Sequence, residues 1–113
     1  MSAITTHILD ISLGSPAPSV PVILERETHE GWQVAGRGVT DDDGRLKFTL
    51  GEDELFEAGH YRLTFDTGGY FAGREIEAFY PHVTVAFTVR DAAQHYHVPL
   101  LLSPFGYSTY RGS

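Results

Sequence analysis

The sequence predicts a single domain, residues 1–113, of the all-β class, built as an antiparallel β-sandwich. Eight short runs in which apolar and polar residues alternate indicate strands with one face toward a core. Turn-forming Gly, Pro, Asp and Ser separate these runs about every ten positions. Only one segment has the character of a helix. A chain of this length buries roughly two-thirds of its unfolded surface, which is enough for a hydrophobic core.

The composition argues against several classes of function. Fifteen acidic and eight basic residues give a net charge of −7, whereas a nucleic-acid-binding protein needs a basic face. The absence of cysteine excludes disulfide bonds and thiolate zinc sites. No secretory signal, apolar run of roughly 20 residues or Ser-Lys-Leu peroxisomal signal is visible. We therefore expect a cytoplasmic protein with neither nucleic acid nor membrane as a partner.

The first half of the chain contains four predicted strands, at 4–13, 20–27, 32–40 and 45–50. The first strand has large apolar side chains on both faces, because Ile8 lies on one face and Leu9, Ile11 and Leu13 lie on the other. His7 shares the second of these faces. Since neither face is polar, we expect both to be covered.

The Asp-Asp-Asp-Gly segment at 41–44 predicts a turn before the fourth strand. Three adjacent acids suggest calcium, but the EF-hand pattern would place Val39 at the first ligand position, so an Asp-Gly turn is favoured. In the strand that follows, apolar side chains at alternate positions point toward the core. Arg45 and Lys47 therefore point away from the core.

The second half begins with an acidic loop or single helical turn at 51–59. Its predicted strands lie at 60–67, 82–89 and 96–102, followed by a turn at 103–106 and a last strand that runs to the C-terminus. Gly68 and Gly69 are expected to end the first of these strands. One or two helical turns are expected at 70–77, weakened by Gly73.

The strand at 96–102 is also apolar on both faces. Tyr96, Val98, Leu100 and Leu102 share one face, and His95, His97, Pro99 and Leu101 share the other. Because the second face carries Leu as well as His, it is expected to be covered, and a second subunit is the natural candidate. A proline in mid-strand conflicts mildly with this position, unless its nitrogen lies at a bulge or a non-bonded position.

Six histidines are many for this chain, and two of them differ from the rest. His29, His60 and His82 lie at turns or strand ends, where a solvated histidine is ordinary. A lone histidine on a covered strand would also usually be a satisfied core or interface residue. His7 and His97 both lie on covered strands, however, with Arg45 facing outward, and together they favour a chemical role.

These groups fit water-mediated hydrolysis of a small, oxygen-rich, anionic or heteroaromatic substrate. A neutral imidazole can take a proton from water, a second can hold the water or donate a proton, and the guanidinium fork can stabilise a negative oxygen. No Gly-x-Ser-x-Gly nucleophile motif is present. Two alternatives remain open: a metal site built from His7, His95 and His97, and a carrier that binds a small aromatic ligand without turnover.

The chain resembles the 5-hydroxyisourate hydrolases, or transthyretin-related proteins, of purine catabolism. The resemblance covers essentially the whole chain and rests on Thr-His-Ile-Leu-Asp at 6–10, Gly-Ser-Pro-Ala at 14–17, the segment 40–45 that ends in Asp-Gly-Arg, Phe-Tyr-Pro-His-Val at 79–83, and 95–113. The terminal Tyr-Arg-Gly-Ser is the most specific of these motifs, because it distinguishes the hydrolases from the hormone carrier transthyretin, which shares the fold.

The resemblance implies a transthyretin-like β-sandwich of two four-stranded sheets with one short helix. It implies a homotetramer, a dimer of dimers, with active sites in the channel between dimers. The implied reaction opens the six-membered ring of 5-hydroxyisourate to give 2-oxo-4-hydroxy-4-carboxy-5-ureidoimidazoline, with no cofactor or metal.

The resemblance also implies the site residues. The catalytic residues would be His7, Arg45, His97 and Ser113, and the substrate-binding residues His7, Arg45, Tyr110, Arg111 and Gly112. One of the two histidines would be the general base, and the residues leave open which. Arg45 would hold the substrate, Tyr110 would shape the pocket wall, and Ser113 would close the site.

Overall fold

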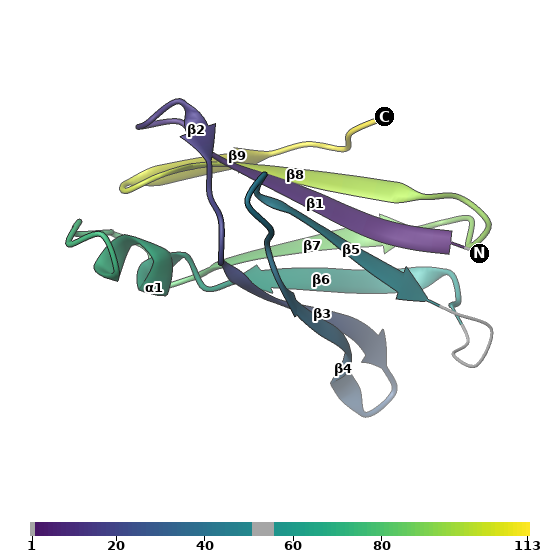
Figure 1. Ribbon diagram of the computed structural model, residues 1–113. Coiled ribbons are helices and arrows are strands. Elements are labelled where there is room, and N and C mark those ends of the chain that lie inside the picture. The colour runs from purple at the N-terminus through teal and green to yellow at the C-terminus, as the bar shows by residue number, and fades with distance from the viewer. Residues whose placement is uncertain (1, 51–55) are drawn as a thin grey trace.

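Two β-sheets pack face to face, and a short helix lies at one end of the sandwich (Figure 1). The computed structural model describes residues 2–50 and 56–113. The elements are β1 (Ser2–Asp10), β2 (Ser15–Pro16), β3 (Pro21–Thr28), β4 (Gly31–Val39), β5 (Arg45–Leu50), β6 (Gly59–Phe65), α1 (Thr67–Ala72), β7 (Val83–Val89), β8 (Tyr96–Ser103) and β9 (Gly106–Thr109).

The first sheet has the order β2-β1-β8-β9, with β5 also paired to β1, and the second has the order β4-β3-β6-β7. The predicted β-sandwich with one short helix is therefore confirmed. Two details differ from the prediction. β1 and β8 pair in parallel, which the long connection through the second sheet allows, because a parallel pair needs a crossover. The two-residue β2 adds a fifth strand within a segment expected to be a loop.

The predicted continuation of the first strand to residue 13 is wrong, because β1 ends at Asp10. The carbonyl oxygen of Asp10 accepts hydrogen bonds from the amides of Leu13 (3.2 Å) and Gly14 (2.9 Å), which closes a turn. Gly14 has a φ of 70°, a conformation that favours glycine. Ile11 and Leu13 consequently leave the sheet and are 58% and 47% exposed.

The helix begins earlier than predicted and includes Gly68 and Gly69, which were expected to end the preceding strand. α1 starts at Thr67 because the Asp66 carboxylate accepts a hydrogen bond from the Gly69 amide (3.0 Å) and caps the helix. At Gly68 a Cβ would lie 2.4 Å from the carbonyl oxygen of Pro81, so only glycine fits this contact. The expected loop at 51–59 lies partly outside the described residues.

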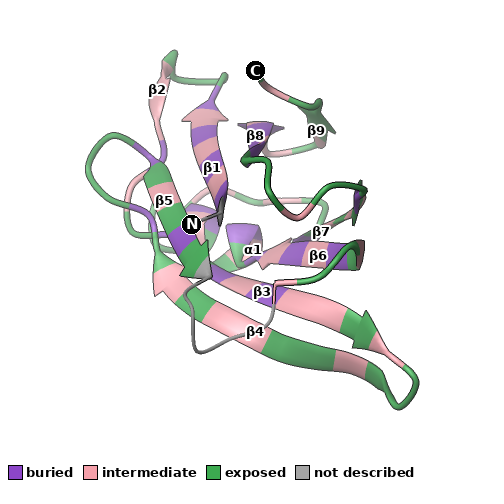
Figure 2. Cartoon of the chain, turned by 90° about the vertical axis from the view of Figure 1, so that its right-hand side faces the viewer, coloured by how far each residue is buried: buried purple, intermediate pink, exposed green. Residues whose placement is uncertain are grey.

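The core lies between the sheets and follows the predicted alternation. Buried bands alternate with less buried ones along β1 and β6 (Figure 2). The fully buried large side chains are Tyr61, Phe65, Phe71, Ile4, Ile8, Leu24, Leu63, Leu100, Leu102, Val20, Val22 and Val83. On β4, a Cβ at Gly36 would lie 2.8 Å from the Phe48 ring, so this glycine makes room for β5. No helix in the described part of the chain is long and apolar enough to cross a membrane.

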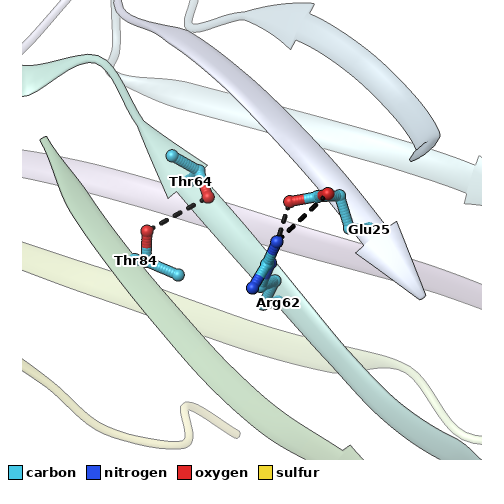
Figure 3. A network of polar contacts seen from close by, with 4 residues as sticks. All are labelled: Glu25, Arg62, Thr64 and Thr84. Carbon is cyan, nitrogen blue, oxygen red and sulfur yellow. Dashed lines mark hydrogen bonds and ion pairs between the residues drawn. The ribbon is translucent and has the colours of Figure 1, made fainter. Parts of the chain in front are cut away.

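Polar side chains on neighbouring strands of the second sheet contact one another (Figure 3). Arg62 donates to both oxygens of Glu25, from Nε at 2.9 Å and Nη2 at 3.3 Å, and its guanidinium carbon lies 4.4 Å from the centre of the Trp32 ring. The hydroxyls of Thr64 and Thr84 lie 3.2 Å apart on neighbouring strands. These contacts tie β3, β4, β6 and β7 together on the side away from the core.

A buried carboxylate ties the helix to β1. Asp10 is fully buried and accepts hydrogen bonds from the Ser12 amide (3.0 Å), the Ser12 hydroxyl and the Tyr70 hydroxyl (2.7 Å). Burial acts to raise the pKa of Asp10, but these hydrogen bonds outweigh it and lower the pKa. The pKa of Tyr70 is raised to about 12, first by burial and then by the neighbouring carboxylate.

Replacement of Asp10 by Asn should destabilise the fold by about 1.5–3 kcal/mol at pH 7, the range for hydrogen bonds to a charged group. Because the pKa of Asp10 in the folded state lies below its ordinary value of 3.8, the stabilisation is fully present above pH 3.8 and is lost as the pH falls through the folded-state pKa. Urea unfolding at pH 7, 4 and 3, at one protein concentration, measures this. Asp42→Asn, in an exposed turn, is the control. An equal loss at all three pH values would contradict the assignment.

Candidate active site

The outer face of the first sheet brings together the three side chains singled out in the sequence. His7 on β1 pairs with Arg45 on β5, and Thr5 on β1 pairs with His97 on β8. The buried residues Ile4, Thr6 and Ile8 occupy the opposite face of β1, so Thr5 and His7 point away from the core. Two rows of paired residues therefore run across β5, β1 and β8: Arg45–His7–Pro99 and Lys47–Thr5–His97.

A cavity of about 610 Å³ lies over this face. Its wall contains Thr5, Thr6, Val39, Asp41, Arg45, Leu46, Lys47, His95, His97 and Ser113. The structure thus gathers Arg45, His97 and Ser113 around one space. His7 does not line this cavity. It lies beside it on β1, between Arg45 on β5 and Pro99 on β8. Arg45 and Lys47 give the cavity two cationic side chains.

His97 is held in its neutral form by its surroundings. Burial lowers its pKa below the ordinary value of 6.5, electrostatic repulsion from Arg45 and His7 lowers it further, and Thr5 acts to raise it. The Nδ1 atom of the ring lies 2.8 Å from the Thr5 hydroxyl oxygen. A neutral imidazole near pH 7 can accept a proton from water.

The predicted turn at 41–44 is confirmed, and it fixes the backbone of Arg45. One carboxylate oxygen of Asp41 accepts hydrogen bonds from the amides of Asp43 (2.9 Å) and Arg45 (2.8 Å). The amide of Asp41 in turn donates to the carbonyl oxygen of Arg45 (2.9 Å). Gly44 has a φ of 75°, and a Cβ there would lie 2.4 Å from the carbonyl oxygen of Ile8. The turn thereby locks β5 against β1 beside His7.

The C-terminal residues divide between two cavities. Gly112 forms a bridge with His97, and its amide donates to the His97 carbonyl oxygen at 2.9 Å. Tyr110 and Arg111 instead border a second cavity of about 300 Å³, whose wall also includes His97. The Arg111 guanidinium carbon lies 4.8 Å from the centre of the Tyr96 ring. The predicted hairpin is confirmed, but its second strand ends at Thr109.

Six wall residues were not predicted as site residues from the sequence: Thr5, Thr6, Val39, Asp41, Leu46 and Lys47. Lys47 was predicted to face outward but was given no role, Thr5 was given none, and Asp41 was considered only as part of the Asp-Gly turn, where calcium binding was disfavoured. Side chains two positions apart share a face of a strand, so the sequence could have placed Thr5 on the face of His7 and Lys47 on the face of Arg45. Among the described residues no group of three or more His, Cys, Asp or Glu side chains is arranged to hold a metal ion, and His7, His95 and His97 do not form one.

Gly112 should be essential for the position of the His97 ring. A Cβ at Gly112 would lie 2.5 Å from His97 Cδ2, so Gly112→Ala should displace the imidazole and shift its ¹H–¹³C resonances. Gly106→Ala is the matched control, because the nearest atom to its Cβ would be the Ser103 hydroxyl oxygen at an ordinary 3.6 Å. If both variants left the His97 resonances unchanged, the close contact between Gly112 and the ring would be refuted.

Comparisons with known proteins agree with this fold. A protein-family model described as the HIUase/Transthyretin family matches residues 4–112. The chain is 46% identical to the 5-hydroxyisourate hydrolase of Salmonella dublin over 110 residues, which cover 97% of this chain and 80% of that protein.

Two solved structures have the same architecture. The 5-hydroxyisourate hydrolase of Klebsiella pneumoniae superposes with a TM-score of 0.85 at 39% identity, covering 98% of this chain and 99% of that one. Sea bream transthyretin, solved in complex with thyroxine, superposes with a TM-score of 0.87 at 35% identity, covering 96% and 93%. These matches confirm the resemblance and the transthyretin-like fold that the sequence predicted, and the chain belongs to the HIUase/Transthyretin family.

Proposed function

We propose that this protein is a cofactor-independent hydrolase of urate degradation that converts 5-hydroxyisourate to 2-oxo-4-hydroxy-4-carboxy-5-ureidoimidazoline. The observation that carries the proposal is the cavity in which Arg45 and a neutral His97 lie together beside the C-terminal Ser113. The names of the Salmonella and Klebsiella relatives support the same substrate. Arg45, Lys47 and His97 in the wall offer hydrogen-bonding groups that suit a compact, oxygen-rich heterocycle.

In the proposed mechanism His97 is the general base. Its lowered pKa suits it to this role, because the neutral imidazole is the form that removes a proton from water. The water oxygen then bonds to a ring carbonyl carbon, and the ring C–N bond breaks as a proton reaches the nitrogen. Arg45 binds the carbonyl oxygen and stabilises the negative charge that develops on it. His7, which is paired with Arg45 on the neighbouring strand, holds the water or supplies the proton to the ring nitrogen.

The C-terminal segment completes the proposed site. Ser113, in the wall of the cavity, closes it by hydrogen bonding to the substrate, and Gly112 allows the chain to pass against the His97 ring. Tyr110 and Arg111 bind substrate from the second cavity, which shares His97 with the first. One nitrogen of Arg111 also donates to the Gln94 side chain at 3.1 Å, which leaves the other N–H groups of the guanidinium for the substrate.

We further propose that the protein works as a homotetramer, a dimer of dimers, with the outer face of the first sheet inside the assembly. Large apolar side chains on the single chain support this: Phe79 is 70% exposed, Phe105 66% and Ile11 58%. Leu9 and Leu101 lie in register on the same outer face as the candidate site and are only half-buried. A second copy that covers these groups would also exclude water from the cavity.

The second candidate function is a carrier of a small aromatic ligand. It is favoured by the likeness to a transthyretin solved with thyroxine bound. The feature against it is the chemistry of the face, where Arg45, Lys47 and His97 would be poorly suited to an apolar ligand.

A coupled assay distinguishes the two functions. Urate oxidase generates 5-hydroxyisourate in place, and the absorbance decay is followed with the native protein, His97→Ala, the control His29→Ala and no protein. Native protein and His29→Ala should accelerate the decay. His97→Ala should lose about 100-fold or more of the catalytic rate, because the general base is removed. Activity should persist from pH 8 to 6.5 and fall only at lower pH, because the pKa of His97 lies below 6.5.

Decay at the spontaneous rate, from a folded protein whose tetrameric mass is verified in the same preparation, would contradict the hydrolase and favour the carrier. A profile that stays flat down to pH 5 would remove a neutral histidine from the mechanism.

A further inference from the structure

We propose that Thr5 is a positioning residue that fixes the ring orientation and the tautomer of His97. The catalytic consequence rests on the proposed function, but the structural statement does not. Thr5 and His97 are directly opposite each other across the parallel β1–β8 pair, and both side chains lie on the outer face of the sheet. The Thr5 hydroxyl oxygen is 2.8 Å from Nδ1 of the ring.

The imidazole is held along two edges. Thr5 contacts the ring at Nδ1, and Gly112 closes the opposite edge, since a Cβ there would lie 2.5 Å from Cδ2. A ring flip would exchange these two edges and place a carbon against the threonine hydroxyl. Thr5 is itself half-buried and β-branched, so few rotamers are open to it. The part of the ring left unoccupied by these two neighbours is the far edge, which carries Nε2.

The contact between Thr5 and Nδ1 bears on which nitrogen of the ring carries the proton. Thr5 acts to raise the pKa of His97, which is the direction expected when a proton on the ring nitrogen that faces Thr5 meets a hydrogen-bond acceptor. The hydroxyl, at 2.8 Å from Nδ1, can accept the same proton. With the proton on Nδ1, the lone pair lies on Nε2, and this is the tautomer that can remove a proton from water at the open edge of the ring.

A hydroxyl suits this task differently from a carboxylate. A carboxylate at Nδ1 would orient the ring but would also stabilise the imidazolium strongly. Thr5 is neutral and orients the ring without adding a negative charge. The positive charge of Arg45 therefore acts on His97 uncompensated by a carboxylate partner at Nδ1. The arrangement gives an oriented imidazole that remains neutral near pH 7.

The direct test is the tautomer of His97, read from the ¹⁵N chemical shifts of its imidazole at pH 8 in the native protein and in variants. Native protein should show the proton on Nδ1. Thr5→Val, which keeps the shape and removes the hydroxyl, should move the population toward the Nε2-protonated form, and Thr5→Ser should restore the native pattern. Thr84→Val is the matched control, because it removes a threonine pair from the opposite sheet (Figure 3).

A native ring protonated on Nε2, or a Thr5→Val ring with the native tautomer, would overturn the proposal. The readout does not require activity, so it stands apart from the proposed function. In the coupled assay, Thr5→Val should lower kcat about tenfold, a fraction of the 100-fold or more expected of a general base, with KM nearly unchanged and with rescue by Thr5→Ser. If the tautomers were as predicted but neither the native protein nor any variant were active, the hydrolase proposal would be refuted, and the role of Thr5 in orienting the His97 ring would stand.

Discussion

The register between β1 and β8 is the constraint on which the rest of the structure depends. β1 pairs with β8 on one side and with β5 on the other, so one strand aligns residues from three distant parts of the chain. A slip of one residue would turn His7 into the core and Ile8 out of it. The register is held from the inside: Ile4 and Ile8 are fully buried, and the Thr6 hydroxyl donates to the Val98 carbonyl oxygen at 2.7 Å.

The core and the candidate site are therefore two faces of the same strands. Asp10 anchors the end of β1 to the helix, and the Asp41 carboxylate anchors the start of β5. The same geometry explains why glycines lie close to the chemistry. Gly44 lies against the carbonyl oxygen of Ile8, and Gly112 lies against the ring of His97. At both positions a Cβ atom would clash with this neighbour. The precision of the site follows from backbone contacts as much as from the side chains that would meet a substrate.

Much of this arrangement could be predicted because a strand alternates with a period of two. The alternation assigned the inward faces of β3, β6, β7 and β8 and placed Arg45, His7 and His97 outside the core. The parallel direction of β8 could not be predicted, because it is set by the path of the chain through the other sheet. The start of α1 was missed because Gly68 has a poor helix propensity, whereas its contact with Pro81 requires a glycine. The Thr5–His97 hydrogen bond joins residues 92 positions apart and has no local signal in the sequence.

The most direct test of the account is the pKa of His97, measured by NMR titration in the native protein, in Arg45→Met and in the control Arg90→Met. β1 pairs with the strands that carry Arg45 and His97, and so brings the two side chains close enough for the charge of Arg45 to act on the imidazole. The native pKa should lie below 6.5, Arg45→Met should raise it because a positive charge is removed, and Arg90→Met should leave it unchanged. A pKa that is the same in all three proteins would contradict the convergence of these strands on one site.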